Sequence, residues 1–167
     1  MAKIAVIGAG AMGSAFCQPL ADNGNDVRLW GTHLDDAIID ELKAGKNHPK
    51  HKYPLPKSVR PFYHGELAEA VEDAEMIVMA VTSDALGKVF EQVVPYLRPG
   101  MIVGSVSKGF DYNREGAVSL LPVILEERLP SDLAGKVDFV FVAGPCKAVE
   151  VLWKAPTSVT YASKNIE

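Results

Sequence analysis

Three glycines near the start of the chain have the spacing of a phosphate-binding turn. Gly8, Gly10 and Gly13 form a G-x-G-x-x-G motif that directly follows a β-branched apolar run and opens a helical pattern. In this context the first glycine permits a tight turn, the second lets backbone amides approach a diphosphate, and the third lets the helix pack on the strand. The amides and the positive helix end would hold the diphosphate. The motif predicts a dinucleotide site, with a turn that binds nothing as the alternative.

The residues after the second predicted strand bear on which dinucleotide binds. Proteins that bind NAD usually carry an Asp or Glu there, about 20 residues beyond the motif, which accepts the ribose hydroxyls. Here the strand ends at Trp30, and Gly31, Thr32 and His33 follow, with no carboxylate before Asp35. A 2′-phosphate would meet no repulsion and could bond Thr32 and His33. NADP is therefore favoured, NAD stays open, and His33 could equally be an ordinary neighbour of a helix cap.

Three further loops belong to the same predicted sheet edge, because ligands of such sheets lie outside the carboxyl ends of the strands. Thr82 follows the fourth strand and could cap a helix or contact a cofactor. Lys108 follows the fifth, where an amine would supply a cation for a phosphate or carbonyl oxygen, unless it is a solvated surface group. After the sixth, Gly144 permits close backbone approach, and we interpret the Cys146 thiol as structural or substrate-contacting.

Length and composition exclude several classes of protein. The 167 residues, 48% hydrophobic and 23% charged, are enough for one domain with a substantial core. A formal net charge of −4 without basic runs argues against binding to nucleic acid or to an anionic membrane. The mid-chain apolar run 76–81 is too short to span a bilayer.

The cysteines and histidines indicate neither a disulfide framework nor a metal site. Cys17 and Cys146 lie far apart and outside any Cys-x-x-Cys pair, which is typical of free thiols in a reducing, cytoplasmic compartment. His48, His51 and His64 have no carboxylate or thiol partners at ligand spacing, so we expect no metal.

The elements that must position these residues alternate between strands and helices, as βαβ units do. The expected strands are Lys3–Ile7, Asp26–Trp30, Val59–Tyr63, Met76–Val81, Met101–Ser105, Val137–Val142 and Thr157–Tyr161. The expected helices are Ala11–Asp22, Leu34–Ala44, Glu66–Glu72, Asp84–Leu97, Ala117–Leu129 and Lys147–Trp153. The proline-containing basic stretch 45–56 is an irregular surface excursion. We predict an α/β fold for residues 1–167: one Rossmann-type domain with a doubly wound, mostly parallel sheet and helices on both faces.

Three segments together resemble NAD(P)-dependent sn-glycerol-3-phosphate dehydrogenase. They are residues 8–15, the block Val106-Ser107-Lys108-Gly109-Phe110, and residues 143–151, which begin Ala-Gly-Pro. The resemblance covers nearly the whole chain, and the Ser-Lys-Gly and Gly-Pro blocks are more specific than the glycine motif. It implies a Rossmann domain followed by an all-helical domain, and a reaction in which a hydride from NAD(P)H converts dihydroxyacetone phosphate to sn-glycerol 3-phosphate.

The resemblance also implies roles for individual residues. Positions that match cofactor contacts are Ala11, Met12, His33 and Ala148, and Lys108 matches a lysine that touches both substrate and cofactor. Gly144 and Cys146 match substrate-binding positions. Two departures affect these matches: the family commonly has Ser-Trp or Asn-Trp in place of Ala11-Met12, and Ser-Phe-Ala in place of Cys146-Lys147-Ala148.

The family's proton-donating lysine and phosphate-gripping arginine belong to its second domain. We therefore expect this chain to be the amino-terminal part of a longer enzyme that takes a small phosphorylated substrate, with a homodimer open for the intact enzyme. Alone, the chain should bind dinucleotide and turn over little. The alternatives are another NADP-dependent reductase of the same two-domain plan, acting on ketopantoate or a β-hydroxyacid, and a stand-alone dinucleotide-binding module.

Overall fold

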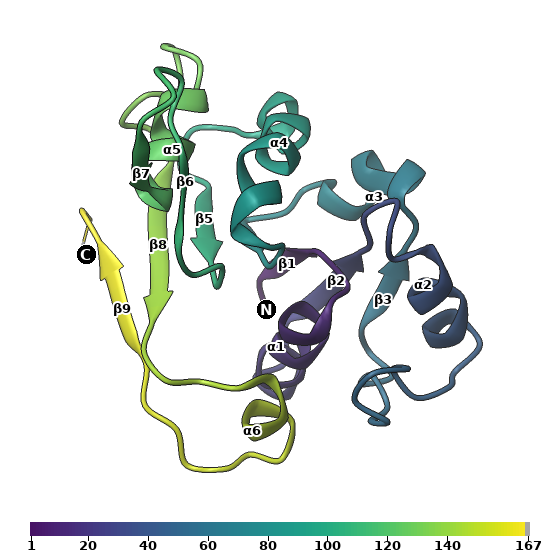
Figure 1. Cartoon of the computed structure of the whole chain (residues 1–167). Coiled ribbons are helices and arrows are strands. Elements are labelled where there is room, and N and C mark those ends of the chain that lie inside the picture. Colours follow the sequence, from purple (N-terminus) through teal and green to yellow (C-terminus); the bar gives the residue numbers. More distant parts are fainter. Residues whose placement is uncertain (166–167) are drawn as a thin grey trace.

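The structure is a computed structural model that describes residues 1–165. Within these residues seven strands form one sheet (Figure 1). In spatial order they are β3 (Arg60–Phe62), β2 (Asp26–Trp30), β1 (Lys3–Ile7), β4 (Met76–Met79), β5 (Ile102–Ser105), β8 (Asp138–Ala143) and β9 (Thr160–Ser163). Neighbouring strands are parallel, except that β9 is antiparallel to β8. The chain proceeds from β1 outward to β3 and then crosses to β4, so the strand order reverses between β1 and β4.

Helices cover both faces of this sheet. On one face lie α1 (Ala11–Asp22) and α2 (Asp36–Lys43), with α6 (Ala148–Leu152) against α1; on the other lie α3 (Leu67–Val71), α4 (Ser83–Val93) and α5 (Leu121–Arg128). Successive side chains of a strand point to opposite faces, so Ala5 and Ile7 of β1 join the core under α3–α5, whereas Ile4 and Val6 join the other. The predicted doubly wound fold is thereby confirmed. In the described chain no helix is long and apolar enough to cross a membrane.

The segment after β5 differs from the sequence prediction. We expected one helix over Ala117–Leu129, but its first residues form β7 (Val118–Leu120), which pairs antiparallel with β6 (Phe110–Tyr112). The hairpin closes because the Asn113 side-chain oxygen accepts two backbone N–H bonds within the turn, at 3.1 and 2.8 Å. Pro122 then lies in the first turn of α5, where a helix needs no N–H donor.

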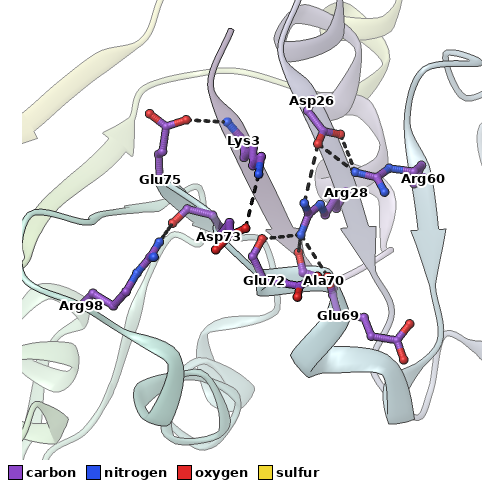
Figure 2. A network of polar contacts seen from close by, with 11 residues as sticks. Lys3, Asp26, Arg28, Arg60, Glu69, Ala70, Glu72, Asp73, Glu75 and Arg98 are labelled. Carbon is purple, nitrogen blue, oxygen red and sulfur yellow. Dashed lines mark hydrogen bonds and ion pairs between the residues drawn. The ribbon is translucent and has the colours of Figure 1, made fainter.

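The amino ends of β1, β2 and β4 carry a polar network (Figure 2). Arg28 is only 6% exposed, and its Nη1 donates to three carbonyl oxygens at the end of α3, those of Glu69, Ala70 and Glu72. The Oδ2 atom of Asp26 lies 3.7 Å from Nη2 of Arg28. The Asp26 carboxylate also accepts two hydrogen bonds from Arg60, and these hold the pKa of the carboxyl below its ordinary value. The network around Arg28 joins α3 to the sheet at the edge opposite the glycine turn.

Two short 3₁₀ turns, η1 (His64–Glu66) and η2 (Val94–Tyr96), complete the described elements.

Candidate functional site

The turn between β1 and α1 needs glycine at its first and last motif positions. Gly8 has a φ of +113°, and a Cβ there would lie 2.8 Å from the Ala80 carbonyl oxygen of the neighbouring strand's loop. Its N–H donates to the Trp30 carbonyl oxygen at 2.8 Å, which ties the turn to the end of β2. A Cβ at Gly13 would lie 1.9 Å from the Gly8 oxygen. Both glycines therefore permit the close approach of the helix start to the strand.

Gly10 differs from these two glycines. A Cβ built there would meet no atom within 4 Å, and the φ of −65° is available to any residue. Gly10 is the N-cap of α1, so the first amides of the helix, beginning at Ala11 and Met12, have no intrahelical acceptor. The open space in front of free amides and a positive helix end suits a diphosphate, and a methyl group at Gly10 would intrude into that space.

At the end of β2, Asp35 comes closer to the glycine turn than its sequence position indicated. Its Oδ2 accepts hydrogen bonds from the Thr32 hydroxyl and the Thr32 N–H, each at 2.8 Å, and from the Ala9 N–H at 3.4 Å. The Thr32 hydroxyl proton is thus committed to a carboxylate, while His33 is exposed. This carboxylate beside the turn could not be predicted from the sequence, because its position depends on the path of the loop and not on residue spacing.

A cavity of ≈ 260 Å³ lies between the end of β2 and α4. Trp30, Thr32 and His33 line it from the β2 side, and Lys88 of α4 and His64 of η1 line it from the other. An adenosine-sized group would fit a mostly apolar cavity with a few polar side chains at its rim. A larger cavity of ≈ 540 Å³ lies at the start of β8, beside Phe139, on the opposite edge of the sheet from the glycine turn.

The loops after β4 and β5 are joined to each other. Thr82 is the N-cap residue of α4, and a hydrogen bond from its side chain is the main cause that lowers the pKa of the Asp84 carboxyl. The Ser107 hydroxyl donates to the Val81 carbonyl oxygen at 2.5 Å. The next residue, Lys108, is exposed, and its Nζ donates to the Gly144 carbonyl oxygen in the loop after β8. The ammonium group is therefore held at the carboxyl edge of the sheet.

The loop after β8 is shaped around Gly144. This residue has a φ of +105°, and its carbonyl oxygen accepts the Cys146 N–H at 3.0 Å in addition to the Lys108 ammonium. Cys146 is half-buried, and Ala148 is the first residue of α6. The Thr157 hydroxyl donates to the Pro145 oxygen at 3.1 Å and anchors the loop from outside. The loop after β8 thus places backbone groups beside the Lys108 ammonium of the loop after β5.

The predicted site residues all lie at the carboxyl edge of the sheet, in the loops after β1, β2, β4, β5 and β8 or in the first turn of the helix that follows. Of these, only Lys108 and Gly144 come within hydrogen-bond distance of each other through a side chain. Sequence reasoning missed Lys88, and it considered His48 and His51 only as metal ligands, whereas both rings contact carbonyl oxygens of the glycine turn. Among residues 1–165 no group of three or more His, Cys, Asp or Glu side chains could hold a metal ion.

The fold and this edge define a dinucleotide-binding α/β domain. Residues 3–167 match the family described as "NAD-dependent glycerol-3-phosphate dehydrogenase N-terminus", and the chain belongs to that family. The match favours this family over the ketopantoate and β-hydroxyacid reductases considered above.

Similar proteins agree with the family match. The chain is 37% identical over 162 residues to the "NADP(+)-dependent glycerol-3-phosphate dehydrogenase" of Archaeoglobus fulgidus, covering 97% of this chain and 47% of the relative. It is 37% identical over 171 residues to the "Glycerol-3-phosphate dehydrogenase [NAD(P)+]" of Bacillus subtilis, covering 99% of this chain and 46% of the relative. The crystal structure of glycerol-3-phosphate dehydrogenase from Coxiella burnetii superposes with a TM-score of 0.83 at 28% identity, over 98% of this chain and 47% of that one. The chain spans about half the length of the curated relatives it matches.

Proposed function

We propose that this chain is the cofactor-binding domain of an enzyme that interconverts dihydroxyacetone phosphate and sn-glycerol 3-phosphate with NAD(P)H. The observation that carries the proposal is the placement of the Lys108 ammonium on the Gly144 carbonyl, at the same sheet edge as the glycine turn. A cation at that edge suits a substrate with a phosphate and a carbonyl oxygen that gains negative charge. The named activities of the relatives support the same choice.

The residues present fit a dinucleotide. The glycine turn, with Gly8, Gly10 and Gly13 and the amides of Ala11 and Met12, would hold the diphosphate. The adenosine end would enter the ≈ 260 Å³ cavity beside His33 and Thr32, and the nicotinamide end would extend past Thr82 toward Lys108 and Ala148. The open space in front of Gly10 supports this placement, because no other part of the described chain fills it.

Lys108 is the residue of this chain that we propose for catalysis. When bound, the cofactor supplies or accepts a hydride at the substrate carbon. The Lys108 ammonium would stabilise the negative charge on the substrate oxygen or phosphate, and the Gly144 carbonyl would orient that ammonium. Gly144 and Cys146 would contact the substrate from the loop after β8. The proton that the substrate oxygen takes up would come from a residue outside this chain.

NADP is the cofactor we favour over NAD. The Lys88 ammonium and the His33 imidazole line the proposed adenosine cavity, where they could donate hydrogen bonds to a 2′-phosphate; His64 also lines it, but its Nδ1 already contacts the Asp36 carboxylate at 2.9 Å. Asp35 opposes that preference, but its Oδ2 is already occupied by the donors of Thr32 and Ala9. A fluorescence titration of the purified chain with NADPH and with NADH tests the proposal, and equal dissociation constants would overturn the preference.

The proposed substrate is tested by assays of the intact enzyme. Reduction of dihydroxyacetone phosphate should exceed reduction of ketopantoate by orders of magnitude, and the reverse result would refute the proposed substrate. We also propose that the enzyme acts in the cytoplasm, which the free thiols of Cys17 and Cys146 support, and that it forms homodimers, which analytical ultracentrifugation of the intact enzyme would test.

A further inference from the structure

The basic excursion 45–56 is closed upon itself. The His48 N–H donates to the Tyr53 carbonyl oxygen at 2.9 Å, and the Lys52 N–H donates back to the His48 oxygen at 2.8 Å. Asn47 and Pro54 form an antiparallel bridge, and the Asn47 amide donates to the Lys52 oxygen at 3.0 Å. The excursion is therefore an ordered loop, although prolines keep it out of helix and sheet.

This loop reaches the glycine turn through His48. The side chain is buried, with 3% exposure, and its Nε2 lies 3.1 Å from the Ala9 carbonyl oxygen. Its Nδ1 accepts the N–H groups of Lys50 and His51, at 3.2 and 3.4 Å. A ring whose Nδ1 is an acceptor must carry its proton on Nε2, so neutral His48 donates to Ala9. The Ala9 oxygen also accepts the Ser14 hydroxyl at 3.0 Å.

His51 makes the second contact. Its Nε2 lies 2.9 Å from the Ala11 carbonyl oxygen, in the first turn of α1, and its ring lies 4.9 Å from the His48 ring, centroid to centroid. The imidazoles of His48 and His51 thus contact the carbonyl oxygens of Ala9 and Ala11, respectively. Gly10, between these two carbonyls, makes no packing contact of its own, since a Cβ built there would have no neighbour within 4 Å.

These contacts have a direct consequence for the amides. A trans peptide is planar, and its C=O and N–H point in opposite directions. A donor held behind the Ala9 oxygen therefore directs the Gly10 N–H to the other side, and a donor behind the Ala11 oxygen polarises the peptide that carries the Met12 N–H. The Met12 amide is one of those that the proposed function assigns to the diphosphate, and the Gly10 amide belongs to the same turn.

We propose that His48 and His51 are positioning residues that hold the glycine turn in the conformation that binds the diphosphate of the dinucleotide. The inference rests on the proposed cofactor function and deepens it, because it assigns part of the affinity to a loop that does not contain the glycine motif. The two rings act through the turn and are not catalytic residues.

The charge state of His48 gives the proposal a pH signature. Burial lowers the pKa of its imidazole below the ordinary 6.5, and the neighbouring His51 and Lys50 act in the same direction. The hydrogen bond to the Ala9 carbonyl oxygen and the Asp35 carboxylate act against them without cancelling the effect of burial. The neutral ring is thus the form the closed loop favours. Below about pH 6.5, His48 takes up a proton more readily when the loop 45–56 is open than when it is closed. The closed loop therefore becomes less stable as the pH falls from above 6.5 toward the lowered pKa. Dinucleotide affinity should decrease over that window.

The experiment compares NADPH dissociation constants and melting temperatures of the wild-type chain, His51→Ala, His51→Gln and Lys57→Ala. Lys57 is an exposed residue just beyond the loop and serves as the matched control. Loss of one hydrogen bond should weaken binding about fivefold to tenfold in His51→Ala. His51→Gln, whose amide can donate to Ala11, should restore affinity to within about twofold, and Lys57→Ala should not change it.

A His51→Ala chain that binds NADPH as tightly as wild type overturns the proposal. So does equal loss in the Ala and Gln variants in proportion to a lower melting temperature, because that indicates a purely structural role. A wild-type affinity that is flat between about pH 5 and 8 refutes the assignment to His48. If the wild-type chain binds neither NADPH nor NADH, the proposed function itself fails, and this outcome is distinct from the others.

Discussion

Two single substitutions in the glycine turn should separate folding from ligand binding. Gly10→Ala adds a methyl group where the chain has no atom within 4 Å, at a φ of −65° that alanine adopts freely. Folding should be nearly unaffected, at a cost within about 1 kcal/mol for the poorer N-cap. Gly13→Ala adds the same methyl group 1.9 Å from the Gly8 oxygen.

The two costs follow from these distances. In Gly13→Ala the helix start and the strand end must move apart by more than about 1 Å to reach ordinary contact, and we expect a loss of stability of at least about 3 kcal/mol. In Gly10→Ala the methyl group meets only the incoming diphosphate. Overpacking of about 1–3 kcal/mol there corresponds to a weakening of NADPH binding of about fivefold to more than a hundredfold.

Urea unfolding followed by circular dichroism measures the first quantity, and titration of NADPH fluorescence measures the second. The expected pattern is a Gly10→Ala chain that stays within about 1 kcal/mol of wild-type stability but binds NADPH poorly, and a Gly13→Ala chain that unfolds at much lower urea concentration. Wild-type NADPH affinity in Gly10→Ala would show that the diphosphate does not approach the turn at this residue. The cofactor placement proposed above would then be wrong.

Three further predictions concern single side chains. In the intact enzyme, Lys108→Ala should lower kcat/KM for dihydroxyacetone phosphate by about a hundredfold or more, since a preorganised charge is lost, and an unchanged kcat/KM would remove Lys108 from the mechanism. Arg28→Met should lower the free energy of unfolding by about 2–4 kcal/mol, because three carbonyl oxygens lose a donor. The NADPH affinity of this variant should stay the same. Arg60→Met, at an exposed arginine, is the control, and an equal loss of stability there would contradict the role of burial. Lys88→Ala should weaken NADPH about twofold to fivefold and leave NADH unchanged in fluorescence titrations, as expected for one exposed charge; parallel losses for both would place the 2′-phosphate elsewhere.

Elements with a strong local pattern were predictable. The helix expected over Ala11–Asp22 and the strands Lys3–Ile7 and Asp26–Trp30 have those bounds in the structure. Their apolar residues recur with a helix or strand period and are bounded by glycine or asparagine, so neighbouring residues suffice to define them. The β6–β7 hairpin was not predictable in this way, because its apolar residues also fit a helix and its turn depends on the Asn113 side chain.

The sequence by itself determined where the glycine turn lies and which loops share its edge, because parallel strands end at a common edge whatever their side chains do. Only the tertiary structure decided which side chains contact the backbone at this edge. Asp35 accepts the Ala9 amide, His48 and His51 contact the Ala9 and Ala11 carbonyls, and Lys108 donates to the Gly144 carbonyl. These contacts join residues 26 to 40 positions apart through irregular loops. Such loops have no period, so only the folded path of the chain brings their side chains to the backbone groups they hold.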